Sequence, residues 1–192
     1  IGRVRTNPNV VPFLSAALAN NRPSIRSTSL AQIDSPSPVP PRRRVLSQSD
    51  SAYLQTSARR TWQYFATFMG PADHVLPPDN FQEHPVERIA HRTSPTNIGL
   101  SLLSNLAAVD FGYITYNQFL DRTSNSFATL QNMETYRGHF YNWYDTLTTD
   151  PLPPRYISTV DSGNLAGMLL TLRQGIIAIP DQPIIGSQLF DG

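Results

Sequence analysis

Apolar side chains recur every three or four residues in four stretches of this chain, and that spacing predicts four α-helices. We expect them at residues 49–69, 95–109 and 115–133 and in a last segment that ends near Gly175. The second and the last are apolar on most sides, which predicts burial. The third has a polar face, which predicts half exposure. The predicted fold is therefore all-α.

Residue types at the helix ends sharpen these predictions. Ser94 followed by Pro95 is typical of an N-cap and a first helical position, because proline there loses no needed N–H. Asp161 or Ser162 is the expected cap of the last helix. Gly70 and the proline after it end the first helix.

The irregular segment between the first two helices, residues 73–85, carries short polar side chains. These are Asp79, Asn80, Gln82 and Glu83. A long connection inside a domain is often functional, so these groups could bind hydroxyls; the alternative is an ordinary solvated loop.

The composition of residues 1–46 predicts a linker that is disordered or extended. We expect residues 47–192 to form the folded part. Within the linker, residues 35–44 are rich in proline and end in three arginines. Such a composition favours polyproline geometry and cannot bury a core. Pro38, Pro41 and Arg43 also match the loose PxxPxR pattern of SH3 ligands, although a stiff spacer accounts for the same residues.

Composition excludes several classes of site and partner. A net charge of +1 gives no reason to expect a nucleic acid or a membrane surface as partner. The absence of cysteine excludes disulfides and thiol catalysis, and the histidines lack the spacing of metal ligands. No apolar run approaches the roughly 18–20 residues of a transmembrane helix. We expect a soluble segment of a longer polypeptide, with no metal and no cofactor of its own.

The alternation of buried, amphipathic and buried helices predicts a partial α/α toroid, in which an inner ring of helices is wrapped by an outer ring. Inner helices run parallel, so the second and last predicted helices should begin at the same end. Helix N-termini carry unpaired N–H groups and a partial positive charge. The loop 139–146 follows the amphipathic helix and should close that same end. Three polar stretches should therefore converge on one rim.

The residues expected on this rim suit a carbohydrate, which needs planar apolar faces and fixed hydrogen-bonding groups. The candidate substrate-binding residues are Arg92, Thr93, Asn97, Asn142, Trp143, Tyr144, Asp161 and Asn164. Asp145 and Asp161 are candidates for the carboxylate pair of glycoside chemistry, although nothing in the sequence requires that they pair. A helix cap at Asp161 and a core position for Trp143 are the structural alternatives.

Several motifs in consistent order resemble the central region of bacterial cyclic β-1,2-glucan synthases, over residues 40–175. They are RRTW at 59–62, LPPDNFQE at 76–83, HRTSPTNIGL at 91–100, DFGY at 110–113, RGHFYNWYDT at 137–146 and VDSGNLAG at 160–167. The resemblance implies the N-terminal part of an α/α toroid of the six-hairpin barrel type. That domain is similar to β-1,2-glucanases and closes the glucan ring by transglycosylation.

The resemblance also implies partners and a location. A membrane-embedded glycosyltransferase of the full-length family uses UDP-glucose as donor, and a phosphorylase-like domain trims chain length. The partners of this segment would be β-1,2-glucan and the remainder of the synthase polypeptide. Its place would be the cytoplasmic side of the bacterial inner membrane. The family's catalytic glutamates are expected beyond Gly192, so the isolated chain should be inactive.

Two alternatives from other classes stay open. The first is a non-catalytic carbohydrate-binding or scaffold protein from a truncated gene product. The second is a free-standing hydrolase that uses Asp145 and Asp161.

Overall fold

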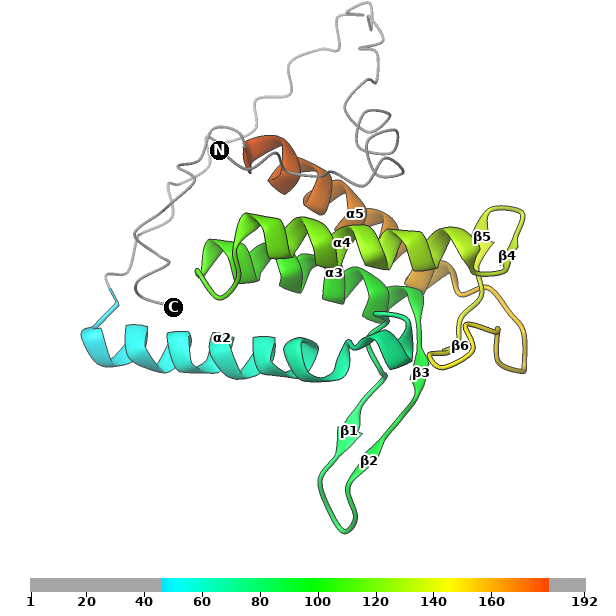
Figure 1. The fold of residues 1–192 in the computed structure, drawn as a ribbon, viewed down its shortest axis with the longest axis horizontal. Helices are drawn as coiled ribbons and strands as arrows, with labels where there is room; N and C mark the ends of the chain where they lie inside the picture. Colours follow the sequence, from blue (N-terminus) through cyan, green and yellow to red (C-terminus); the bar gives the residue numbers. More distant parts are fainter. Residues whose placement is uncertain (1–45, 180–192) are drawn as a thin grey trace, which may run out of the picture. The chain divides into compact units, whose positions relative to one another are not determined.

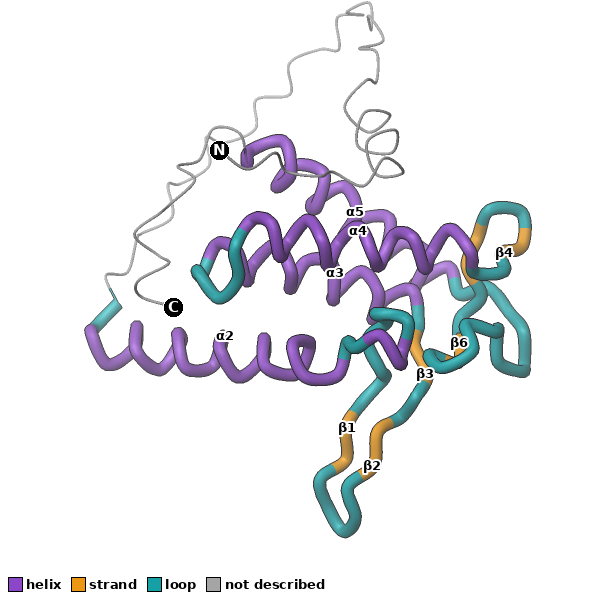
Figure 2. The backbone as a smooth tube through the Cα atoms, in the orientation of Figure 1, coloured by secondary structure: helices purple, strands orange, loops and turns teal. Residues whose placement is uncertain are grey.

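The computed structural model describes residues 46–179, which form four α-helices with short strands between them (Figures 1 and 2). The helices are α2 (Gln48–Phe68), α3 (Pro95–Asp110), α4 (Tyr116–Asn132) and α5 (Thr159–Ala178). The predicted all-α fold is therefore confirmed. The linker expected at 1–46 and its Pro38, Pro41 and Arg43 pattern lie almost entirely outside the described residues, and the expected domain boundaries stay predictions.

The chain divides into two compact units, residues 1–56 and 57–192. In the first unit, the described residues 46–56 contain the start of α2. There the Ser47 hydroxyl accepts a hydrogen bond from the backbone N–H of Asp50 (3.1 Å) and donates one to its carboxylate (2.7 Å). Such reciprocal bonds satisfy groups that a helix start leaves unpaired. All further contacts described below lie within the second unit.

Capping decides where the next helices begin. Ser94 caps α3 as predicted, and its side chain accepts from the Asn97 N–H at 3.2 Å. The prediction for α5 is wrong: Ser158 is the cap, and its side chain accepts from the Asp161 N–H at 3.1 Å. Ser158 has the extended backbone that an N-cap needs, so α5 begins before Asp161 and Ser162. This leaves the Asp161 carboxylate free to contact other elements.

The helices α3 and α5 run parallel and in close contact. A Cβ atom added at Gly99 would collide with Met168, and one added at Gly175 would collide with Leu106. From the first contact to the second, the residue number rises along both helices, from 99 to 106 in α3 and from 168 to 175 in α5, so the helices run parallel. A larger residue at either position would force the facing side chain, Met168 or Leu106, to shift.

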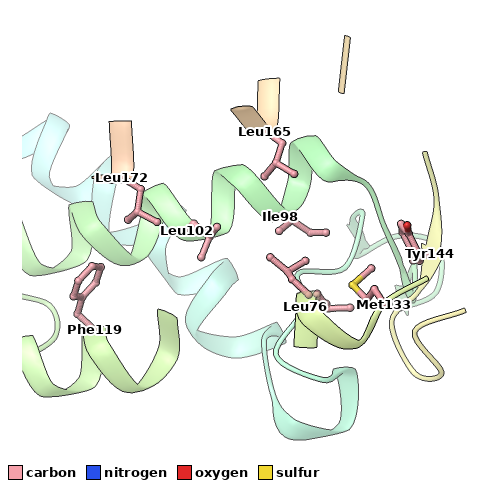
Figure 3. Close-up of a cluster of buried hydrophobic side chains, with 9 residues drawn as sticks. Leu76, Ile98, Leu102, Phe119, Met133, Tyr144, Leu165 and Leu172 are labelled. Carbon is pink, nitrogen blue, oxygen red and sulfur yellow. The ribbon is translucent and has the colours of Figure 1, made fainter. Parts of the chain in front are cut away.

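The core lies between α3, α4, α5 and the loops at one end of these helices (Figure 3). Its buried apolar side chains are Leu76, Ile98, Leu102, Phe119, Leu130, Met133, Tyr144, Leu165 and Leu172. Only one face of α5 joins this core: Val160 is 69% exposed and Leu170 is 65% exposed. The expectation that this helix is buried on most sides is therefore wrong for the described part of the chain, where α3 alone packs extensively on it.

Short strands bring distant loops together at the N-terminal end of α3. The strand β3 (Arg92–Thr93), just before α3, pairs antiparallel with β6 (Tyr144–Asp145), which follows α4. The hairpin of β1 (Phe81–Gln82) and β2 (Arg88–Ile89) precedes β3. The remaining elements are a 3-10 helix, η1 (Pro71–Asp73), and the hairpin of β4 (Thr135–Tyr136) and β5 (His139–Phe140). The loop 139–146 thus lies at the end where α3 begins, as predicted.

Within residues 46–179, every helix is too short or too polar to span a bilayer.

Candidate functional site

The N-terminal turns of α3 and α5 meet through direct side-chain hydrogen bonds. The Thr96 hydroxyl donates to Oδ1 of Asp161 at 2.6 Å, and Nδ2 of Asn164 donates to the Thr96 hydroxyl at 3.1 Å. The two helices therefore begin at the same end, as the sequence predicted. Two sets of unpaired helical N–H groups and two partial positive charges lie on one side of the molecule.

Asn142 connects this contact to the loop after α4. In the amide orientation that satisfies its neighbours, Nδ2 donates to Oδ2 of Asp161 at 3.0 Å. Its Oδ1 accepts from the Tyr156 hydroxyl at 2.8 Å and from Nε1 of Trp143 at 2.6 Å. Asn142 itself is buried. It fixes two aromatic side chains and one carboxylate in a single arrangement.

Protein donors engage both carboxylate oxygens of Asp161. Burial alone would raise its pKa, but hydrogen bonding with Ser158 and Thr96 outweighs that effect and holds the pKa below its ordinary value. The carboxylate is therefore ionised at neutral pH. This favours a hydrogen-bond acceptor or a base over the proton donor of glycoside cleavage, whose pKa must be raised.

Asp145, the other candidate carboxylate, is part of a local turn. Its Oδ1 accepts from the backbone N–H groups of Leu147 at 2.7 Å and Thr148 at 3.1 Å. This is the usual side-chain-to-backbone pattern of an aspartate in a turn. Both candidates thus have structural partners, and a catalytic role for the pair stays a prediction.

A second polar group lies beside the first and centres on Arg92. Its Nε and Nη2 donate to Oδ2 of Asp79 at 3.1 and 2.8 Å, and Nδ2 of Asn97 donates to Oδ1 of the same carboxylate at 3.3 Å. Cζ of Arg92 lies 4.7 Å from the centroid of the Trp143 ring, which is a cation–π contact. One face of Trp143 is therefore covered by a guanidinium group.

Asp73 holds the segment just before β3 through hydrogen bonds. Its carboxylate accepts from Nδ1 of His91 at 2.7 Å and from the buried Thr146 hydroxyl. The Thr146 N–H donates to the His91 carbonyl at 3.1 Å. These contacts hold the chain just before β3, whereas the Arg92 side chain at the start of the strand is 50% exposed.

The structure therefore brings most of the predicted site residues together. Trp143, Asn97 and Asp161 are half-buried, Asn164 is exposed, and the Arg92 side chain is 50% exposed. Two predicted residues are fully buried, Thr93 and Tyr144, each at 0% exposure. Direct contact of Tyr144 with a ligand, as in sugar stacking, is thus wrong for this structure.

Tyr144 is buried and stabilises the loops of the site through hydrogen bonds. Its hydroxyl donates to the Glu134 carbonyl at 2.7 Å and accepts from the Tyr141 N–H at 2.7 Å. Burial raises the pKa of Tyr144 to about 12, so the side chain is neutral at physiological pH. Its place opposite Thr93 in the β3–β6 pair explains why both residues are covered.

Sequence reasoning did not place three members of the site. Asp79 is one of several polar residues in the loop 73–85, and Thr96 follows the cap Ser94 without a pattern of its own. Tyr156 had no pattern to single it out, because it lies in a proline-rich connection. Each is assigned by contacts between segments that are distant along the chain.

The fold matches part of a glucoamylase-type α/α toroid. The crystal structure of a glucoamylase-like protein from Bacteroides fragilis NCTC 9343 superimposes with a TM-score of 0.55 and 19% sequence identity. The match covers 73% of this chain and 37% of that one. At this identity the likeness shows the fold alone, and it agrees with the parallel helices α3 and α5. No family model matches the sequence.

The chain is also similar in sequence to part of a known synthase. Over 128 residues the chain is 48% identical to the cyclic beta-(1,2)-glucan synthase NdvB of Rhizobium meliloti (strain 1021). The aligned region is 67% of this chain and 4% of that protein. The chain is homologous to a part of this synthase, as its motifs had indicated.

Proposed function

We propose that this chain forms part of the glucan-binding wall of the domain that closes the ring in a cyclic β-1,2-glucan synthase. The observation that carries the proposal is the joined polar network at the N-terminal ends of two parallel toroid helices. The network connects Asp79, Arg92, Asn97, Thr96, Asn142, Trp143, Tyr156, Asp161 and Asn164.

The chemistry of the network suits glucose units. Trp143 is half-buried and Tyr156 is 46% exposed, so both present partly accessible aromatic surface for sugar C–H groups. Arg92 and Asn164 add exposed donors for hydroxyls, and their geometry is fixed by protein contacts before any ligand arrives. Preorganised polar groups beside an aromatic surface are the usual make-up of an orienting ligand site.

The chain contributes binding, and the reaction itself belongs to the larger polypeptide. Asp145 and Asp161 both accept hydrogen bonds from protein groups, and the lowered pKa of Asp161 favours an acceptor over a proton donor. UDP-glucose would serve the polymerising part of the synthase and would not contact this segment. The same proposal places the segment at the cytoplasmic side of the inner membrane, with the rest of the synthase and β-1,2-glucan as its partners.

Calorimetric titration with linear β-1,2-glucan tests the proposal, with a β-1,3-glucan as the linkage control. We expect Arg92→Ala and Trp143→Ala to weaken binding. Arg59→Ala is the matched control, since Arg59 also lies over an aromatic ring, with Cζ 4.4 Å from the centroid of Tyr113. A chain that melts cooperatively but shows neither binding heat nor a raised melting temperature with the β-1,2-glucan would refute the proposal.

A further inference from the structure

Asp79 is held firmly in place before any ligand is considered. Its backbone N–H donates to the Ala90 carbonyl at 3.1 Å, and the two residues before it, Pro77 and Pro78, are fully buried. The Tyr64 hydroxyl donates to the Pro78 carbonyl at 2.8 Å. The Asp79 side chain is 19% exposed. The carboxylate therefore has a fixed position between α2 and the rim.

That carboxylate holds two groups of the proposed glucan site. Oδ2 accepts both Nε and Nη2 of Arg92, and Oδ1 accepts Nδ2 of Asn97. Charge-assisted hydrogen bonds of this kind are about twice as strong as neutral ones. Arginine has a long side chain with many rotamers, and the Arg92 side chain is 50% exposed here. Asp79 supplies the contacts that keep this group over Trp143.

We infer that Asp79 is a positioning residue for the glucan site: it fixes Arg92 over Trp143 and aims the Asn97 amide. The inference rests on the proposed function. Asp79 acts through these two side chains and not by contact with the sugar. Its effect on affinity should therefore disappear when its two partners are removed.

The test compares Asp79→Ala with Asp79→Asn in the intact chain, by titration with linear β-1,2-glucan. Asp79→Ala should weaken binding about tenfold or more, because three charge-assisted bonds, two from Arg92 and one from Asn97, lose their acceptor. Asp79→Asn keeps the shape and one acceptor oxygen but loses the charge. Its glucan affinity should therefore lie between that of the unmodified chain and that of Asp79→Ala. Glu87→Ala is the control, since Glu87 is an exposed acidic residue on the neighbouring hairpin.

Tryptophan fluorescence gives a readout that does not depend on glucan. The chain has two tryptophans, so a Trp62→Phe background leaves Trp143 as the reporter. Asp79→Ala should change the Trp143 emission in the same direction as Arg92→Ala, while Glu87→Ala leaves it unchanged. In a variant that already carries both Arg92→Ala and Asn97→Ala, adding Asp79→Ala should reduce glucan affinity little further.

The outcomes separate the inference from the proposed function. If Arg92→Ala and Asn97→Ala weaken binding but Asp79→Ala does not, the inference is overturned and the proposed function stands. If none of the three affects glucan binding, the proposed function fails. The emission then still decides whether Asp79 positions Arg92 over Trp143, and an emission unchanged by Asp79→Ala and Asp79→Asn overturns that assignment.

Discussion

Two glycines of the same helix, Gly175 and Gly167, should respond to alanine in opposite ways. A Cβ at Gly175 meets the side chain of Leu106 on α3, with Cδ1 at 2.8 Å and Cγ at 3.1 Å. A Cβ at Gly167 has no atom within 4 Å. Both positions lie inside α5, so alanine gains similar helix propensity at each.

The magnitudes follow from two effects. Alanine in place of glycine stabilises a helix interior by about 0.5–1 kcal/mol. Forcing a methyl group into a packed contact costs about 1–3 kcal/mol. Gly167→Ala should therefore raise the free energy of unfolding by up to about 1 kcal/mol. Gly175→Ala should lower it by up to about 2 kcal/mol, which is the packing cost less the propensity gain.

Urea unfolding of the two variants, followed by circular dichroism, measures both changes in the same protein. The midpoint should rise for Gly167→Ala and fall for Gly175→Ala at unchanged slope. A Gly175→Ala variant that is as stable as Gly167→Ala would refute the close parallel packing of α3 and α5. Leu106→Ala provides the check on mechanism, because it removes the colliding side chain and should restore the benefit of alanine at 175.

Three further predictions concern the caps and the support of the rim. Ser158→Ala should cost about 0.5–2 kcal/mol in urea unfolding, whereas Ser162→Ala should leave stability nearly unchanged; equal effects would contradict the observed cap. The pKa of Asp161 is lowered in the folded chain. The stability that Asp161 contributes is therefore present above its ordinary pKa of about 3.9 and is lost as pH falls through its pKa in the folded chain. Asp161→Asn should reduce this acid-induced loss in unfolding curves taken from pH 7 downward, and an unaltered pH profile would contradict the assignment. Tyr144→Phe should cost about 1–3 kcal/mol, because it removes two part-buried hydrogen bonds, to the Glu134 carbonyl and from the Tyr141 N–H, each worth about 0.5–1.5 kcal/mol. A calorimetric titration should show glucan affinity nearly unchanged, and a large loss of affinity at full stability would contradict the supporting role.

The local features of this chain could be read from its sequence. Helix positions followed from the spacing of apolar residues, and the start of α3 followed from Ser94 and the proline after it. The shared end of α3 and α5 followed from the alternation of buried and amphipathic helices. Helix positions and the cap of α3 depend on neighbours three or four positions away, so the order of residues is sufficient to predict them, whereas the shared helix end was predicted from the expected toroid arrangement.

The detailed make-up of the rim was decided only by the tertiary structure. Ser158, Asp161 and Ser162 are all suitable caps by residue type, and the direction in which the chain enters α5 selects Ser158. The register of β3 with β6 buries Thr93 and Tyr144 and leaves Arg92 at the surface. Arg92 meets Asp79 and Trp143 because that long-range pairing aligns loops from three parts of the chain. The sequence predicted which residue types converge, but only packing across large sequence separations determined which side chains face solvent and which support them.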